Sequence, residues 1–498
     1  MSAFTNAVLA ICALENIVPE CDILIRNVQV LDGSGAEPFA GAVAIDGDRI
    51  NDVGELPDYT SQETIDGRKR TLAPGFIDAH THDDLYLIRK PDMLPKLSQG
   101  VTTVIVGNCG ISGAPATVNG AIVDPMTLLG AVEEFHYPTF SEYVAAVRRA
   151  APAVNVAAMV GHTVLRNNHM GRLDREATDD EVAAMRAQLH AALDQGAIGL
   201  STGLAYASAY SASTREVMAL AECLTGKGAI YATHLRSESD RILPAMEEAF
   251  NVGRHVHAPI VISHLKCAGI DHWHKSAQII KFLGDQDNTH AIGWDCYPYA
   301  ASSSTLDLRQ VDDRVNITIT WSEPHPEMSG KSLAQVATTW GLSQINAAKR
   351  LQPAGAIYHC MSEEDVRSIL RHPRTMIGSD GLPNDPLPHP RLWGTFPRVI
   401  GPYVREHKLF SLSEAVRKMT SLPAERFRLK DRGYLRPGYA ADLVLFDAEQ
   451  IADTATFANP VQASVGIEAV WVNGVLSLCN ERTTQRRGGR FLPRQKDM

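Results

Sequence analysis

The stretch LAPGFIDAHTHDD, residues 72–84, is the one around which this chain is organised. An apolar pair, Phe76-Ile77, leads into His80 and His82, which stand two residues apart. Residues i and i+2 of a strand point to the same face, so we expect the two imidazoles to lie side by side at a strand end. Neutral imidazole is a common zinc ligand, so the pair predicts half of a metal site. Two surface histidines in a loop are the alternative, and the preceding Pro-Gly and the neighbouring acidic residues favour the metal site.

The length, charge and cysteine content of the chain limit the kinds of protein that it can be. With 498 residues the chain is too long for one ordinary domain, but it fits a barrel with insertions and an accessory domain. A net charge of −10 without a long basic run makes nucleic acid an unexpected partner. Eight scattered cysteines predict no disulfide framework and a reducing compartment. The apolar patch AVLAICAL at residues 7–14 has no preceding lysine or arginine and is too short to span a membrane, so we expect a cytoplasmic protein without a membrane partner.

Between residues 73 and 429 buried strands alternate with helices. The candidate strands are residues 74–80, 101–108, 154–162, 197–203, 229–234, 259–264, 291–297 and 375–380. Thr178-x-x-Glu181 and Ser213-x-x-Glu216 are capping boxes that predict helix starts between them. Eight apolar strands with intervening helices predict an α/β fold with a (β/α)8 TIM barrel. The alternative, a doubly wound open sheet, lacks its Gly-rich phosphate loop after the first strand.

The sequence pattern at the two ends of the chain differs from the alternation of strands and helices in the middle. Short alternating runs with turn signals occupy residues 22–72 and return at 433–480, so we expect 1–72 and 430–485 to form one small β-sandwich domain. The long connection 299–374 between strands seven and eight predicts an inserted lid subdomain over the site. The polar and basic tail RTTQRRGGRFLPRQKDM is expected to be partly ordered at best.

Potential metal ligands gather at the ends of the predicted strands, where barrel enzymes place their chemistry. They are His80, His82, Cys109, His234, His264 and Asp380. Each alone has an ordinary interpretation as a buried cysteine or a satisfied core histidine, but together they predict a metal site. Sulfur and imidazole ligands favour zinc over magnesium and calcium. Zinc lowers the pKa of bound water to about 7, and Asp380 would serve as general base and then acid, which predicts metal-assisted hydrolysis.

Several blocks, from about residue 22 to 480, resemble the N-acyl-D-amino-acid deacylases (D-aminoacylases) of the amidohydrolase superfamily. They include PGFIDAHTHDD, QGVTTVIVGNCGIS, GAIGLSTG, YATHLR, VISHLK, MIGSDGLP and HPRLWGTFPR. GNCG is the most specific, because many relatives bridge their metals with a modified lysine whereas these deacylases use a cysteine. The resemblance implies one tightly held zinc on Cys109, His234 and His264. It also implies a second, weaker position that His80 and His82 line and that shares Cys109, with Asp380 as the catalytic acid–base beside the metal.

The resemblance also implies how the substrate is held. Lys266, Tyr297 and Arg391 match residues that bind the substrate carboxylate, and Tyr206 matches a tyrosine near the scissile carbonyl. A guanidinium grips a carboxylate bidentately and a lysine adds a point charge, so the residue types suit the task. A surface salt bridge for Arg391 and a solvated end for Lys266 are the alternatives.

Two positions depart from the family's pattern. Leu265 stands where relatives often carry a second histidine. The stretch AASSSTLDLRQ, residues 300–310, differs in its charged residues and is expected to face the substrate side chain, with Ser303 among the binding residues. Arg309 could meet an acidic side chain there, although a solvated lid arginine is the favoured interpretation.

The resemblance thus implies zinc-dependent hydrolysis of N-acyl-D-amino acids to a carboxylate and a free D-amino acid. Selectivity for the D form comes from the resemblance only. One alternative is a cyclic-amide hydrolase of the hydantoinase or dihydroorotase kind, which Cys109 in the bridging position disfavours. Another is a catalytically inactive scaffold, which the six filled ligand positions disfavour. The preferred side chain, the acyl group, occupancy of the second metal position and the oligomeric state stay open.

Overall fold

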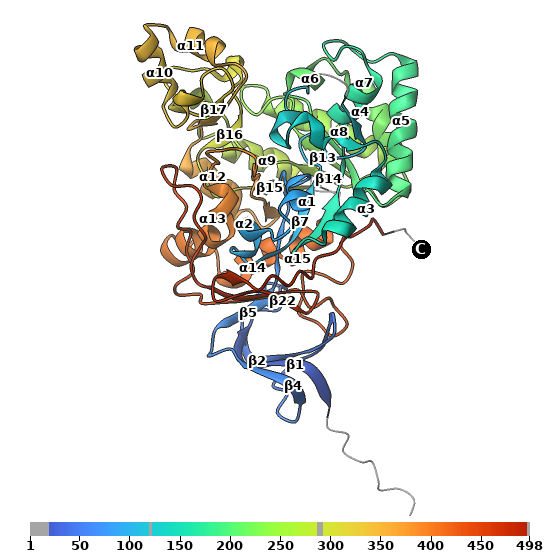
Figure 1. Ribbon diagram of the computed structural model, residues 1–498, viewed down its shortest axis with the longest axis vertical. Helices are drawn as coiled ribbons and strands as arrows, with labels where there is room; N and C mark the ends of the chain where they lie inside the picture. The colour runs from blue at the N-terminus through green and yellow to red at the C-terminus, as the bar shows by residue number, and fades with distance from the viewer. Residues whose placement is uncertain (1–18, 119–121, 286–291, 496–498) are drawn as a thin grey trace, which may run out of the picture.

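Strands from both ends of the chain share one sheet in the computed structural model, which describes residues 19–118, 122–285 and 292–495 (Figure 1). The apolar patch at 7–14 lies outside these residues. The strands are β1 (Glu20–Val30), β2 (Phe39–Asp46), β3 (Arg49–Gly54), β4 (Thr60–Asp66), β5 (Thr71–Pro74), β20 (Leu443–Phe446), β21 (Ile467–Val472), β22 (Val475–Cys479) and β23 (Arg482–Thr483). Their order is β23-β22-β21-β20-β5-β1-β2-β3, with β4 paired to β1. The antiparallel β5–β20 pair therefore joins the two ends of the chain.

The middle of the chain forms parallel strands, and each predicted apolar segment contains one. They are β6 (Phe76–Asp78), β7 (Val101–Val106), β10 (Asn155–Ala158) with β11 (Val160–Gly161), β12 (Gly199–Gly203), β13 (Ile230–His234), β14 (Ile260–Ile262), β15 (Ile292–Cys296) and β19 (Thr375–Ile377). Neighbours pair in chain order, as β6-β7-β10 and β11-β12-β13-β14-β15-β19. The first and last of these strands also meet, because Ala79 N donates to Ile377 O at 3.2 Å and Thr81 bridges Gly381. Their carboxyl ends consequently open on one common side.

Helices follow most of these strands. They are α1 (Tyr86–Arg89), α2 (Leu94–Leu97), α3 (Phe140–Ala150), α4 (His162–His169), α5 (Asp179–Asp194), α6 (Ala207–Tyr210), α7 (Thr214–Ala221), α8 (Ile242–Val256), α9 (Ser276–Asp285), α12 (Glu363–Arg371), α13 (Arg391–Arg398), the π-helical η7 (Val399–Glu406), α14 (Leu412–Met419) and α15 (Ser421–Arg426). Both predicted capping boxes start a helix, since Thr178 caps α5 and Ser213 caps α7. Among the described residues no helix combines the length and apolarity needed to cross a membrane.

The long connection before β19 builds a small unit with its own apolar core. Strands β16 (Ser302–Thr305), β17 (Ile317–Ser322) and β18 (Ala354–Tyr358) form an antiparallel sheet in the order β16-β18-β17. Helices α10 (Leu333–Trp340) and α11 (Gln344–Leu351) lie at the end of the molecule opposite the terminal sheet (Figure 1). The last helix of the connection, α12, instead packs against α9 and β19.

The C-terminal tail is more ordered than its composition predicts. Leu492 N donates to Val156 O at 2.7 Å, and Val156 N donates to Arg490 O at 2.9 Å, so the tail runs beside β10. Phe491 is 7% exposed and packs edge-on against Phe140 of α3, with ring centroids 5.9 Å apart. The expectation of a partly ordered tail is therefore wrong for residues up to 495, because one aromatic residue anchors an otherwise polar segment.

Candidate metal centre

A glycine-flanked turn after β7 presents Cys109 to the centre. Gly107, Cys109 and Gly110 all have positive φ, of 77°, 53° and 76°. A Cβ on Gly107 would lie 2.2 Å from Met159 O, and one on Gly110 would lie 2.6 Å from the amide nitrogen of Gly203. Glycine is required at both positions, because any side chain would collide with the backbone of the neighbouring strands. The two glycines of the block GNCG thus allow the backbone to approach the neighbouring strands closely enough to bury the Cys109 thiol.

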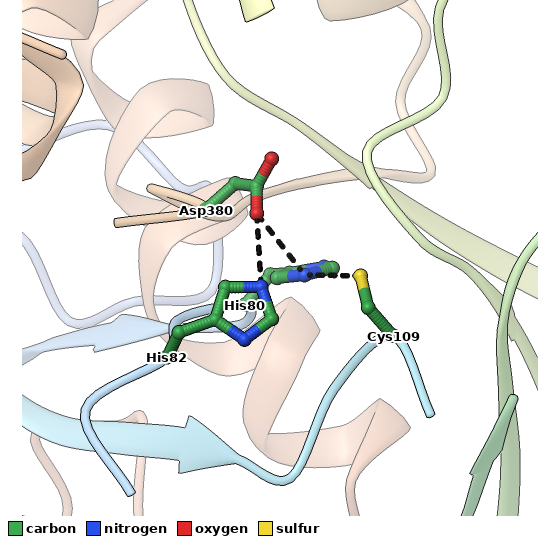
Figure 2. Close-up of side chains that lie close together, drawn as sticks. All are labelled: His80, His82, Cys109 and Asp380. Atoms are coloured by element: carbon green, nitrogen blue, oxygen red, sulfur yellow. Dashed lines mark hydrogen bonds and ion pairs between the residues drawn. The ribbon is translucent and has the colours of Figure 1, made fainter. Parts of the chain in front are cut away.

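The other five side chains predicted to be ligands come together around this thiol. Cys109 Sγ lies 3.3 Å from His80 Nε2 and 3.3 Å from His264 Nε2. Figure 2 shows His82 and His80 beneath Asp380, whose Oδ1 lies 3.2 Å from His82 Nε2 and 3.5 Å from His80 Nε2. The potential ligand atoms fall into two groups, each within 4.8 Å: His80, His82, Cys109 and Asp380 form one, and Cys109, His234 and His264 form the other. Cys109 belongs to both groups.

The electrostatics of the centre favour a thiolate and a carboxylate. Burial alone would raise the pKa of the Cys109 thiol, but positive charge on His80 and His264 outweighs it and holds that pKa well below its usual range. Burial would likewise raise the pKa of Asp380, but Arg391 and the histidines lower it well below its ordinary value. The surroundings therefore favour the ionised form of both groups.

Backbone strain gathers at the same place. His264 and Asp380, like Cys109, adopt positive φ, of 35° and 48°. Such conformations are uncommon outside glycine and persist where the surrounding structure enforces them, most often at functional sites.

The donor set fits zinc. The Nδ1 atom of His234 is buried and has no hydrogen-bond partner among the residues that the structure describes. A buried, unpaired imidazole nitrogen in a cluster of imidazoles around a thiolate is the environment that a soft, nitrogen- and sulfur-preferring cation satisfies. Magnesium and calcium, which require oxygen ligands, do not match it.

Two further carboxylates support the histidines from behind. Asp295 lies 3.3 Å from His80 Nδ1 and accepts from the His264 amide at 3.0 Å. Glu238 Oε1 lies 2.9 Å from His264 Nδ1. Asp295 lies within the predicted strand 291–297, but the sequence predicted no role for it or for Glu238, whose only signal is its position four residues after His234. Such outer carboxylates set the tautomer and orientation of histidine ligands.

One histidine that ends a predicted strand stands apart from the centre. His162 Nε2 lies 2.9 Å from Glu216 Oε1, and the same oxygen accepts from Arg166. Burial lowers the pKa of His162, so it is a neutral partner in a structural network.

The residues expected to hold substrate lie beside the centre. Arg391 is fully buried, pairs with Asp380 Oδ2 at 2.9 Å and stacks over Tyr297 at 4.6 Å from the ring centroid. Lys266 Nζ lies 2.6 Å from Glu238 Oε1 and 5.9 Å from the same tyrosine ring. Three buried polar atoms here lack a hydrogen-bond partner within the described ranges: Tyr297 Oη, Ser303 Oγ and Arg391 Nε. The alternative interpretation of Arg391, a surface salt bridge, is excluded because its side chain is buried.

A cavity of about 1140 Å³ opens beside the centre, and of the residues expected to hold substrate its lining includes Lys266 and Ser303 but not Arg391 or Tyr297. Its lining includes His82, His234, His264, Asp380, Tyr206, Lys266, Ser303 and residues 311–315 and 341–345 of the inserted unit. Tyr206 lies over His234 with ring centroids 4.9 Å apart. Arg309 also lines the cavity, and its charge is matched by Asp307 at 2.6 Å.

A buried ion cluster lies beneath the centre. Lys96 Nζ lies 2.8 Å from Asp78 Oδ2 and 3.2 Å from Asp83 Oδ2, and the three side chains are fully buried. Asp78 Oδ1 also accepts from the Ser379 amide at 2.8 Å. The cluster therefore ties the end of β6, two residues before His80, to the segment after β19 that leads into Asp380.

Comparison with known proteins gives consistent matches over almost the whole chain. A family model described as "Amidohydrolase family" matches residues 63–239 and 287–477. An N-acyl-D-aspartate deacylase of Alcaligenes xylosoxydans xylosoxydans is 46% identical over 96% of each chain, and a D-aminoacylase of that organism is 45% identical over 95% of this chain and 98% of its own. A solved N-acyl-D-glutamate deacylase of Bordetella bronchiseptica, complexed with zinc and a phosphonate that mimics the tetrahedral intermediate, superposes with a TM-score of 0.92. That structure is 42% identical, over 95% of this chain and 100% of its own.

Proposed function

Since this chain belongs to the D-aminoacylases of the amidohydrolase family, as its sequence resemblance predicted, we propose that it hydrolyses N-acyl-D-amino acids to a carboxylate and a free D-amino acid. The observation that carries the proposal is the meeting of four imidazoles, a thiol and Asp380. Of these side chains, those of His82, His234, His264 and Asp380 line one cavity. The enzyme is a hydrolase of linear amides, and its cofactor is zinc.

The ligands divide into two positions that share a thiolate. Cys109, His234 and His264 would hold the tightly bound zinc, and His80, His82 and Asp380 would line the second, weaker position. When bound, zinc supplies a Lewis acid for the acyl carbonyl and lowers the pKa of water.

Asp380 performs the proton transfers. Its carboxylate faces the cavity, is ionised, and lies against His82 and Arg391, so it can take a proton from the attacking water. The proton passes to the amide nitrogen of the substrate when the C–N bond breaks, which releases the D-amino acid as a free amine. Tyr206 donates a hydrogen bond to the oxyanion that forms from the carbonyl; its position at the cavity wall, with its ring 4.9 Å from that of His234, supports this role.

The substrate carboxylate lies toward Arg391, Lys266, Tyr297 and Ser303. The unpaired Tyr297 Oη, Ser303 Oγ and Arg391 Nε support this placement, because a buried donor without a partner costs about 1–3 kcal/mol unless a ligand satisfies it. Two cations lie close to one aromatic ring, and each is also paired with a carboxylate: Lys266 with Glu238 and Arg391 with Asp380. Their remaining N–H donors can bind the substrate carboxylate.

The side-chain preference lies in the inserted unit. Relatives named for aspartate, for glutamate and for D-amino acids in general match this chain at 46%, 42% and 45% identity, so overall similarity does not select among them. Arg309 lines the cavity but is paired with Asp307. An acidic substrate side chain could bind Arg309 only by replacing Asp307 as its partner.

We extend the proposal to the domains. Residues 73–429 are the catalytic (β/α)8 barrel, supported by the ring of eight parallel strands whose first and last members meet. Residues 1–72 and 430–485 form the accessory β-sandwich domain, and 299–374 include the lid, supported by its contribution to the cavity wall.

The test is release of free amino acid by the zinc-loaded protein from paired N-acetyl-D and N-acetyl-L forms of Met, Leu, Phe, Asp and Glu. Turnover of the D forms alone is the expected result. Hydrolysis of hydantoin or dihydroorotate rings without any turnover of the linear amides would replace the proposal with the cyclic-amide alternative, and no turnover of either class with zinc bound would favour the inactive scaffold.

Asp380→Asn tests the assigned base. General acid–base groups contribute roughly 10²–10⁴-fold to rate, so we expect kcat to fall by at least that factor while the tightly bound zinc on Cys109, His234 and His264 is kept. Asp179→Asn, on the exposed start of α5, is the control and should keep full activity. Equal activity of Asp380→Asn and the wild type would remove Asp380 from the chemistry.

A further inference from the structure

Glu238 contacts both the histidines of the proposed tight zinc position and the lysine proposed to bind the substrate carboxylate. Its Oε1 lies 2.9 Å from Nδ1 of His264 and 2.6 Å from Nζ of Lys266. Its Oε2 lies 3.5 Å from Nε2 of His234. Its side chain is 12% exposed and lines the cavity.

The contacts of the ring nitrogens show how the imidazoles of His264 and His234 are oriented. His264 turns Nε2 toward Cys109, at 3.3 Å, and Nδ1 toward Glu238. His234 turns Nε2 toward Glu238 and keeps Nδ1 buried without a partner among the described residues. In His264 the nitrogen that faces Glu238 is thus not the one that faces Cys109, and in His234 it leaves Nδ1 as the nitrogen without a partner.

We propose that Glu238 is a positioning residue that fixes both histidines of the tight zinc position and, through the same carboxylate, holds Lys266 for the substrate carboxylate. Nδ1 of His264 faces two groups, Glu238 Oε1 at 2.9 Å and the Lys266 ammonium at 2.7 Å. With Nε2 of His264 free for the metal, the proton stands on Nδ1, and of these two groups only the carboxylate can accept it. With Nδ1 of His234 free for the metal, its Nε2–H faces Oε2. One carboxylate accepting from two ligand histidines sets both tautomers and both ring orientations.

The lysine contact gives the same residue a second effect. The Lys266 ammonium donates to Glu238 Oε1 and, at 3.2 Å, to the backbone oxygen of His264, which keeps it beside the ligand histidine. A flexible lysine held in this way loses less conformational freedom when an anion arrives. Metal binding and substrate binding are thus coupled at Glu238, and this inference rests on the proposed function for the identity of the anion.

The experiment compares Glu238→Gln, Glu238→Asp and Lys266→Met for zinc affinity, measured by competition with a chromophoric chelator on metal-free protein. Loss of an outer carboxylate typically weakens metal binding 10–100-fold, so we expect that loss in Glu238→Gln. Glu238→Asp keeps the charge and should recover part of the affinity. Lys266→Met should bind zinc within threefold of the wild type but raise KM, whereas Glu238→Gln should change both zinc affinity and KM.

Glu216→Gln is the matched control, because Glu216 is also a buried carboxylate against a histidine, but His162 is not among the candidate ligands. It should leave zinc affinity unchanged. Zinc affinity of Glu238→Gln within threefold of the wild type would overturn the proposal, as would an equal loss in Glu216→Gln. If Glu238→Gln does not fold, Glu238→Asp decides, since a shortened carboxylate that leaves zinc affinity intact would also refute it. The chelator assay needs no turnover, so its outcome is separate from failure of the hydrolysis assay.

Discussion

Lys96→Met is expected to destabilise the protein strongly, because it leaves carboxylates buried without their cation. Lys96, Asp78 and Asp83 are fully buried, with N–O distances of 2.8 and 3.2 Å. Methionine keeps the length of the side chain, so the perturbation is mainly the lost charge and the bonds to Thr81 Oγ1 and Ser379 Oγ at 2.9 and 3.0 Å. Removing one partner of a buried ion pair costs about 3–5 kcal/mol.

The loss should depend on pH in a definite direction. Burial already raises the pKa of Asp83, and Lys96 opposes that rise. Without Lys96 the folded-state pKa rises further above the unfolded value, so the native variant binds more protons than its unfolded chain. Its stability must then increase as pH falls toward that pKa.

Equilibrium urea unfolding of variant and wild type at pH 8 and pH 5 measures both effects. We expect the deficit in unfolding free energy to be larger at pH 8. Lys418→Met is the control, because Lys418 is also a buried lysine, with a pKa that burial lowers to about 8. Its partner Glu414, 3.6 Å away, is partly exposed, so removing Lys418 leaves no buried carboxylate without a cation. A Lys96→Met deficit below about 1 kcal/mol, or one that is equal at both pH values, would refute the reasoning.

Two further predictions concern the metal centre and the tail. Burial lowers the pKa values of His82 and His264, but neighbouring negative charges raise both to about 9, so zinc binding at pH 7 should release protons and its affinity should rise with pH up to about 9. Calorimetric titration in two buffers of different ionisation enthalpy checks this, and identical heats would contradict it. Phe491→Ala removes the aromatic anchor packed on Phe140 and should cost about 3–5 kcal/mol of unfolding free energy, whereas a loss within 0.5 kcal/mol, the usual range for surface substitutions, would show that the tail contributes little.

Local patterns predicted the parts of this molecule that depend on neighbours in sequence. Apolar runs located the central strands, and the capping boxes at Thr178 and Ser213 marked two helix starts. Residues at strand ends, such as Cys109, could be grouped because parallel strands open on a common side.

What could not be predicted depends on contacts between distant segments. Glu238 meets His264 only because two different loops approach each other, and the i+4 spacing from His234 carries no helix to give it meaning. In the sequence Lys96 is indistinguishable from a surface lysine, and only the structure shows that it is buried against Asp78. Phe491 stands in a polar tail whose binding surface, beside Val156, is formed more than 300 residues earlier.

The β5–β20 pair has a consequence for synthesis of the chain on the ribosome. Thr71–Pro74 emerges early, but its hydrogen-bonding partner Leu443–Phe446 is made about 370 residues later. At about 5–20 residues per second, this apolar strand edge waits roughly 20–75 s for its partner. An unpaired apolar edge is a template for association with other nascent chains. Yield should therefore be limited by this interval, and faster elongation or early chaperone binding should improve it more than added stability of the finished fold.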